Sequence, residues 1–189
     1  MTRTGEAGVK RRASSDDALA LATATHLAGR RVDMGTLAKE LGVGRATLYR
    51  WFGSREALME EVLLARARAF VALAREGSGG TGDERLMDIF RAMIAAAQTA
   101  LPVRLFIERE PQLALRILAG EHGRLHRFFV EQALIDVGAS RGPEHARALE
   151  ARVEATVQLV TTLVWVAVAI GDDPPTERIE TLARELLAR

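Results

Sequence analysis

A twenty-residue segment, Met34–Gly53, constrains the fold of this chain more than any other stretch. Its apolar residues recur at helical spacing on both sides of Gly42, which predicts two short helices joined by a tight turn. Asp33 stands where it can cap the first helix, and Gly42 stands just past its end, where a left-handed backbone costs glycine little. The segment therefore predicts helices over 34–41 and 45–52.

The same segment meets the requirements of a helix-turn-helix. Such a motif needs a small residue where its helices cross, a glycine in the turn and apolar residues that fix the second helix. Ala38 is the small residue, and Gly42 follows it four positions later. The apolar residues that would fix the helices are Leu37, Leu41, Val43, Leu48 and Trp51. An ordinary helical hairpin with solvated arginines is the alternative, but the agreement of all these features favours the helix-turn-helix.

The second helix of the motif has a basic outer face, formed by Arg45, Ala46, Tyr49 and Arg50 with Thr47 at its border. Arginine side chains can contact base edges or phosphates, and the small Ala46 permits close approach to a base. Tyr49 can donate its hydroxyl to a phosphate. The free amides that begin the next helix, together with Arg55, form an anion site for another phosphate.

Helical signals continue along the rest of the chain, and no stretch alternates as a strand should, so we expect an all-α protein of about nine helices. Ser14 or Ser15 can cap a helix over 16–28, and Ser54 can cap a helix over 55–76. The latter has an apolar stripe made of Leu58, Val62, Ala65, Ala69 and Leu73. A glycine-rich loop follows at 77–82. The remaining expected helices cover 83–100, a short stretch from 102, 111–119, 121–137, 144–170 and 176–188, with a loop over 138–143.

Charge and composition divide the chain in a way that agrees with the motif. Residues 1–55 contain ten Lys/Arg against five Asp/Glu, whereas residues 56–189 contain sixteen against twenty. Because the first quarter of the chain is basic and the remainder is acidic, the charge distribution favours phosphate binding at the N-terminal end. We therefore expect a flexible basic arm over 1–13, a DNA-binding domain over 14–54 and a helical ligand-binding and dimerisation domain over 55–189.

The location expected is cytoplasmic. The chain has no cysteine, which excludes disulfides and thiolate metal sites and agrees with a reducing compartment. The first thirteen residues are polar and basic and do not form a signal peptide. The longest apolar run, Val157–Ile170, is interrupted by polar residues and is interpreted as a buried helix, not a membrane span.

The segment Leu37–Leu58, with the helix before it, resembles the DNA-binding domain of the TetR family of bacterial regulators. The resemblance implies an all-helical dimer, most often a repressor released by a small ligand. It also implies that Tyr49 and Arg55 contact phosphates and that Arg45, Ala46, Thr47 and Arg50 face the major groove. The expected DNA-binding residues are Thr36, Gly44, Arg45, Ala46, Thr47, Tyr49, Arg50 and Arg55.

Three residues depart from the family pattern. Asp33 stands where Ser or Thr is common near a phosphate, and its carboxylate should repel DNA if it lies close. Gly35 stands where many members carry an arginine that contacts a base. Gly44 replaces the common serine cap of the recognition helix. We therefore expect operator recognition to depend mainly on Arg45, Thr47, Tyr49 and Arg50.

The C-terminal part is less specific. Its segments 106–111 and 120–124 resemble regulators of quorum-signal lactone degradation. The helix expected over 144–170 is apolar on most of its sides, which calls for partners on most sides. The resemblance implies a four-helix dimer interface built from the last two helices of each subunit, and such a dimer calls for a palindromic operator in double-stranded DNA.

A ligand pocket is expected among the middle helices. Its candidate residues are Phe90, Met93, Phe106, Arg109, Phe128, Phe129, Gln158, Thr161, Thr162 and Trp165. For any single apolar residue in this set, simple core packing is the alternative. The polar members are better candidates, because buried polar groups need partners and a ligand can supply one.

Other chemistry finds little support in the sequence. His122 and His126 lie four residues apart and, with Glu108 or Glu121, could bind a divalent metal, but such a pair is more often a surface or hydrogen-bonded pair. No catalytic grouping or phosphate loop is found, so we expect neither an enzyme nor a cofactor. The sequence thus predicts a DNA-binding transcriptional regulator, a repressor released by a small, largely apolar ligand. The alternative is an effector-independent regulator or architectural protein with a solidly packed C-terminal domain.

Overall fold

The structure, a computed structural model, describes residues 12–188, which form eleven α-helices. In chain order these are α1 (Ser15–Leu27), α2 (Met34–Leu41), α3 (Arg45–Phe52), α4 (Arg55–Gly77), α5 (Asp83–Thr99), α6 (Leu101–Arg109), α7 (Pro111–Leu118), α8 (Arg124–Arg141), α9 (Pro143–Ala148), α10 (Glu150–Ile170) and α11 (Thr176–Ala188). No strand occurs between residues 12 and 188, and the all-α prediction is confirmed. The basic arm predicted over 1–13 lies almost entirely outside the described residues.

The N-terminal helices begin and end where local chemistry places them. Asp33 caps α2 by accepting hydrogen bonds from two backbone amides, and Ser14 and Ser54 cap α1 and α4 with their hydroxyls. Gly42 follows α2 with a φ of 66°, in the left-handed region that favours glycine. Helices α2 and α3 have the bounds that the sequence predicts.

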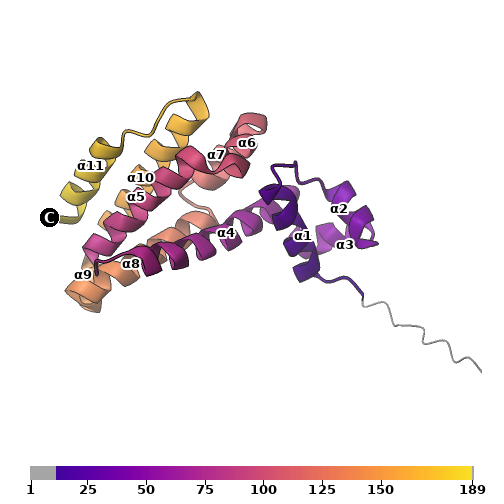
Figure 1. Cartoon of the computed structure of the whole chain (residues 1–189). Coiled ribbons are helices and arrows are strands. Elements are labelled where there is room, and N and C mark those ends of the chain that lie inside the picture. Colours follow the sequence, from indigo (N-terminus) through magenta and orange to yellow (C-terminus); the bar gives the residue numbers. More distant parts are fainter. Residues whose placement is uncertain (1–11, 189) are drawn as a thin grey trace, which may run out of the picture.

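The elements form two units joined by one long helix. Helices α1, α2 and α3 pack together at one end of the molecule, and α4 extends from them into a larger helical bundle (Figure 1). Near its start α4 packs on α1 and α3, and it also packs on α5 and α8. Helix α10 lies in the bundle against α5, α7, α8 and α11. Helix α4 therefore belongs to both units.

The inner face of α4 differs from the predicted stripe. Leu58 and Val62 are buried as expected, but Leu73 is 68% exposed. The helix instead buries a neighbouring face that includes Leu63, Leu64, Ala67 and Val71. Because α4 has partners on more than one side, its buried surface is wider than a single stripe.

The region before α10 also differs from the sequence prediction. The loop expected over 138–143 is wrong, because α8 continues to Arg141, and the single helix expected over 144–170 is divided into α9 and α10 at Leu149. Gly138 lies inside α8, where an added Cβ would come within 3.6 Å of the Ala146 Cβ on α9. Gly138 therefore does not end the helix, and the space around it would accept a Cβ at ordinary contact distance. The described residues thus contain eleven helices, slightly more than the nine expected.

Helix α10 is long and apolar enough to cross a membrane by length and composition, but 44% of its most apolar window is buried inside the structure. Core helices of globular proteins pass the same test. Val153, Val157, Val160 and Val164 are fully or almost fully buried. The apolar character of α10 is therefore explained in part by its place in the core.

Candidate nucleic-acid interface and internal cavity

The outer face of α3 is exposed and basic. Gly44, Arg45, Ala46, Tyr49 and Arg50 are exposed, and Thr47 is half-buried at the edge of the same face. Leu48, on the opposite side of α3, is fully buried in the core formed with Leu37 and Ala38 of α2. The structure therefore brings the predicted base-facing residues together on one surface, while the apolar side of α3 anchors the helix.

The start of α2 places a negative charge near this face. The Asp33 carboxylate accepts from the amides of Gly35 and Thr36 and from the Thr36 hydroxyl. The hydrogen bond from the Thr36 amide is the main reason that the pKa of Asp33 is lowered, so this cap is ionised at neutral pH. Thr36 is exposed, but its hydroxyl is directed to Asp33. Asp33 thus combines a helix cap with a charge that opposes phosphate.

Arg55, a predicted phosphate contact, is engaged inside the molecule. Its two terminal nitrogens each lie 2.6 Å from a carboxylate oxygen of Glu110, and its Nε donates to the Val32 carbonyl at 2.6 Å. Arg31 lies 3.5 Å from the same carboxylate. Burial favours a raised pKa for Glu110, but the hydrogen bonds and charge of Arg55, aided by Arg31, lower it overall. Glu110 therefore forms ion pairs with two arginines of the basic N-terminal part, Arg55 and Arg31.

Further contacts join helices α1 to α3 to α6. Arg109 donates to the Gly29 carbonyl, and the His26 ring meets the Phe106 ring edge-on at a centroid distance of 6.0 Å. A Cβ added to Gly29 would come within 2.8 Å of Leu105, so the α1–α2 loop lies directly on α6. Movement of α6 must therefore change the surroundings of the α1–α2 loop.

A partly open cavity of about 150 Å³ lies between the helices of the bundle. Its walls come from α4, α5, α7, α8 and α10 and from the segment that enters α6. The lining residues are Leu63, Arg66, Ala67, Phe70, Met93, Ala96, Ala100, Val103, Leu118, Phe129 and Trp165. Three predicted ligand residues, Met93, Phe129 and Trp165, are in this wall.

The contribution of α4 to this cavity was missed by the sequence prediction. Leu63, Arg66, Ala67 and Phe70 follow one another at steps of three, one and three, which places them on one side of a helix. That spacing is visible in the sequence. The neighbouring stripe through Leu58 and Val62 is equally apolar, so the sequence did not indicate which of the two faces lines the cavity.

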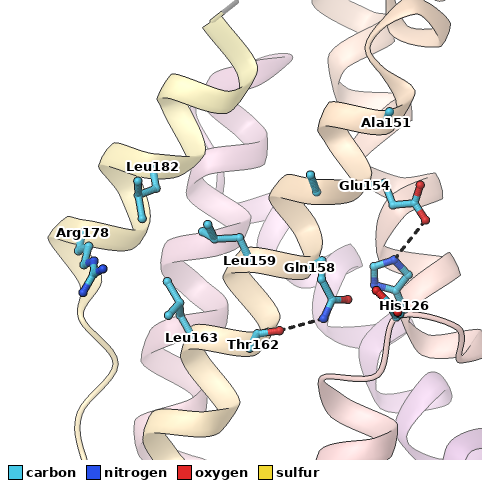
Figure 2. A pocket seen from close by; sticks show the side chains of 11 residues that line it. His126, Ala151, Glu154, Gln158, Leu159, Thr162, Leu163, Arg178 and Leu182 are labelled. Atoms are coloured by element: carbon cyan, nitrogen blue, oxygen red, sulfur yellow. Dashed lines mark hydrogen bonds and ion pairs between the residues drawn. The ribbon is translucent and has the colours of Figure 1, made fainter.

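A second, larger hollow of about 670 Å³ is an open groove along α10 and α11. Figure 2 shows Leu159, Leu163 and Leu182 on its apolar side, with Gln158, His126 and Glu154 at the other end. Gln158 donates to Thr162 and to the Ala119 carbonyl, both at 2.9 Å. Its Oε1 and the His126 Nε2 are buried without a hydrogen-bond partner among the described residues. The predicted ligand residues Gln158 and Thr162 therefore line this groove and not the internal cavity.

The other predicted ligand residues occupy different places. Phe106 and Arg109 lie at the contact between α6 and α1, around a hollow of only about 10 Å³. Phe90 belongs to the buried core, and Phe128 packs against it. The Thr161 hydroxyl donates to the Val157 carbonyl of its own helix at 2.9 Å. The structure thus distributes seven of the ten predicted residues over three separate hollows, while Phe90, Phe128 and Thr161 line none of these three.

The histidine pair does not form a metal site in this conformation. Within residues 12–188 no group of three or more His, Asp or Glu side chains is arranged to hold a metal ion. The His122 side chain is 91% exposed, whereas His126 is buried with its Nε2 3.9 Å from Glu154. Burial is the main cause of the lowered pKa of His126. The two rings therefore have different environments despite their spacing.

Comparisons with known proteins agree with both units of the fold. A family model described as bacterial regulatory proteins, tetR family, matches residues 21–62. A second one, described as tetracyclin repressor-like, C-terminal domain, matches residues 81–188. The structure of the R. erythropolis transcriptional repressor QsdR from TetR family is similar with a TM-score of 0.80 and 25% identity, covering 92% of this chain and 93% of that one. A comparison with curated proteins found no match.

Proposed function

The chain belongs to the TetR family of transcriptional regulators, and on this premise we propose that it is a repressor released from its operator by a small, largely apolar molecule. The observation that carries this proposal is that one molecule has both an exposed basic face on α3 and an apolar cavity in its C-terminal bundle. The first is suited to the major groove and the second to an effector.

For DNA binding, Arg45 and Arg50 supply cations on the exposed face, Tyr49 supplies a hydroxyl and Ala46 leaves room for a base edge. Gly44 is the N-cap of α3 and supplies no side-chain cap hydrogen bond, so the first amides of α3 are left to bind a phosphate. Thr36 and Arg55 are less available, because Asp33 and Glu110 hold them. We assign specificity mainly to Arg45, Thr47 and Arg50 and orientation mainly to Tyr49.

The family usually forms homodimers, and the groove along α10 and α11 supports a dimer through these helices. Val166 and Ile170 of α10 are 39% and 69% exposed in the single chain, and Leu159, Leu163 and Leu182 line the groove beside them. A second copy would remove this apolar surface from water. The resulting two-fold symmetry places two α3 helices on a palindromic operator.

The cavity is connected to the DNA-binding unit by short structural links. Val103, in the cavity wall, lies on α6, whose last residue Arg109 donates to the Gly29 carbonyl. Arg66, also in the wall, lies on α4, which begins at Arg55. A molecule that favours one position of α6 relative to α4 would therefore shift the orientation of α3.

The test begins with selection of operator DNA from a random double-stranded library by the purified full chain. Arg50→Ala and Tyr49→Ala should weaken specific binding at least about tenfold, since each removes one contact of about 1–3 kcal/mol. Arg68→Ala, which removes an exposed arginine of α4 away from α3, is the matched control and should bind normally. Unchanged affinity in Arg50→Ala and Tyr49→Ala would refute α3 as the recognition helix.

The second candidate is a regulator or architectural protein that needs no effector. Its C-terminal bundle would be solidly packed, whereas the bundle here has a cavity of about 150 Å³, which is smaller than the roughly 300–1,000 Å³ of most ligand sites. We propose no enzymatic role, because the family consists of regulators, and we expect the cytoplasm as the place of action. Operator binding that no small molecule alters would favour this second candidate.

A further inference from the structure

The internal cavity has an almost entirely apolar wall with two exceptions, Trp165 and Arg66. Ten of its lining residues are aliphatic or aromatic, and within the described chain Arg66 is the one charged residue among them. A purely apolar cavity of this volume accepts a molecule of about the size of benzene. The two exceptions therefore decide which chemical group such a molecule carries.

Trp165 leaves a hydrogen-bond donor unused. The residue is 8% exposed, and its Nε1 is buried without a partner among residues 12–188. A buried indole N–H normally finds an acceptor, because leaving it unpaired costs about 1–3 kcal/mol. No oxygen among residues 12–188 accepts from this N–H. An acceptor oxygen on a bound molecule would satisfy this N–H.

Arg66 adds a positive charge at the same wall. Its side chain is exposed, and no ion pair or hydrogen bond of Arg66 is found in the part of the chain that the structure describes. Its charge also contributes to the lowered pKa of His26 on α1, after burial as the main cause. Arg66 therefore lies between the cavity and the DNA-binding unit, available to an anion.

We propose that the effector is a small monocarboxylate with an apolar body the size of an aromatic ring or a short acyl chain. The body fills the cavity, the Trp165 indole turns so that Nε1, buried in the described structure, donates to a carboxylate oxygen, and Arg66 favours the negative charge. This assignment rests on the proposed function and deepens it by naming the chemical class of effector. It also gives binding a route to α1, because the added charge lies beside an arginine whose charge acts on His26.

Isothermal titration of the full chain with butanoate, hexanoate, octanoate, benzoate and phenylacetate tests the class directly. The best carboxylate should bind about tenfold or more tightly than its own methyl ester, because a charge-assisted hydrogen bond is stronger than a neutral one. Equal binding of acid and ester, or binding of none of these probes, would overturn the proposal.

Two substitutions test the assigned groups. Trp165→Phe keeps an aromatic ring but removes the N–H, and it should weaken carboxylate binding about tenfold. Arg66→Gln should reduce the preference for the acid over its ester, by about three- to tenfold for an exposed charge, whereas Arg68→Gln on the same helix should not. Wild-type affinity in both Trp165→Phe and Arg66→Gln would overturn the assignment.

A filled cavity provides a test that does not depend on either polar group. Ala96→Leu places a larger side chain in the cavity wall and should abolish carboxylate binding, while Ala95→Leu, exposed on the same helix, should retain it. Thermal melting of both variants verifies that each one folds. Full carboxylate affinity in a folded Ala96→Leu variant would place the site elsewhere and overturn the proposal.

The same samples separate this proposal from the proposed function. If operator DNA is bound but no carboxylate binds, the effector class is wrong while the regulator assignment stands. If a carboxylate binds through Trp165 and leaves operator affinity unchanged, the site stands and the release mechanism is wrong. The expected result is binding in the cavity together with at least about tenfold loss of operator affinity, within the range of allosteric coupling.

Discussion

Both carboxylate oxygens of Glu110 lie 2.6 Å from terminal nitrogens of Arg55, so the junction between α6 and α7 holds the first residue of α4. Arg31 approaches the same carboxylate at 3.5 Å. Glu110 therefore uses guanidinium nitrogens that would otherwise be free to contact a phosphate. The interaction joins the C-terminal bundle to the basic N-terminal unit.

Replacement of Glu110 by glutamine should increase DNA affinity. The change frees Arg55 and Arg31 to contact phosphate and removes a negative charge, so we expect DNA to bind about three- to tenfold more tightly. The slope of log affinity against log salt concentration should become steeper by the amount that about one phosphate contact contributes. Fluorescence anisotropy over a range of salt concentrations measures both quantities. Glu108→Gln, an exposed neighbour on α6, is the control, and an equal effect in both variants would contradict the role of Glu110.

Asp33 is expected to limit DNA binding while it stabilises α2. Asp33→Ser keeps an oxygen cap and removes the charge, so melting should change little and DNA affinity should rise. Asp33→Ala removes the cap as well and should cost about 1 kcal/mol of stability. Melting curves and DNA titrations of the two variants separate the two roles. Loss of DNA affinity in a folded Asp33→Ser variant would contradict the prediction.

The groove between α10 and α11 should be the dimer interface. Leu159→Glu places a charge on a half-buried apolar position and should produce folded monomers, which analytical ultracentrifugation detects. Leu73→Glu, on an exposed site of α4, should leave the oligomeric state unchanged. A dimeric Leu159→Glu variant would show that another surface associates.

The Arg75–Asp136 pair should be important for the packing of α4 on α8. Asp136 is 2% exposed, and its carboxylate accepts from Arg75 at 2.9 Å, while Arg75 also donates to Gln132. Asp136→Ala removes the carboxylate partner of Arg75, which keeps its bonds to Gln132, and should cost about 1.5–3 kcal/mol. Chemical denaturation measures the loss. Glu56→Ala, in the exposed pair with Arg116, is the control and should cost about 1 kcal/mol or less.

Stability should fall as the pH drops below the usual histidine pKa. Burial lowers the pKa of His126 and outweighs the carboxylates of Glu154 and Glu121, while His122 and Arg127 lower it further. Since the unfolded chain then binds more protons than the folded one, stability present above about pH 6.5 is lost on acidification.

Melting between about pH 7.5 and about pH 5.5 measures this loss. His126→Gln should reduce the slope, whereas His145→Gln, at an exposed site, should not. His26, whose pKa burial also lowers, accounts for part of the remaining slope. An unchanged slope in His126→Gln would contradict the assignment.

The local elements of the N-terminal unit could be predicted from sequence because their signals are local. Asp33, Gly42 and Ser54 each define a helix end through contacts with residues no more than a few positions away. The exposed face of α3 followed from its periodicity alone, and Leu48 is buried opposite it as expected. The basic charge of this part was also visible without a structure.

The C-terminal site could be predicted only in part. Met93, Phe129 and Trp165 share one cavity wall, but Gln158 and Thr162 belong to the outer groove. A helix as apolar as α10 has several packed sides, and periodicity does not tell which side faces which neighbour. The division of α9 from α10 was missed for a similar reason, since Leu149 carries no local signal of a helix end.

The amino-acid sequence alone determined the helical class, the caps and turns of α1 to α4, and the basic face that identifies the family, since these depend on neighbours along the chain. Only the tertiary structure decided which α4 residues line the cavity, that the Trp165 N–H lacks a partner and that Glu110 holds Arg55. The Arg55–Glu110 pair, for example, joins residues 55 positions apart. Their placement depends on how the helices pack, which no local pattern specifies.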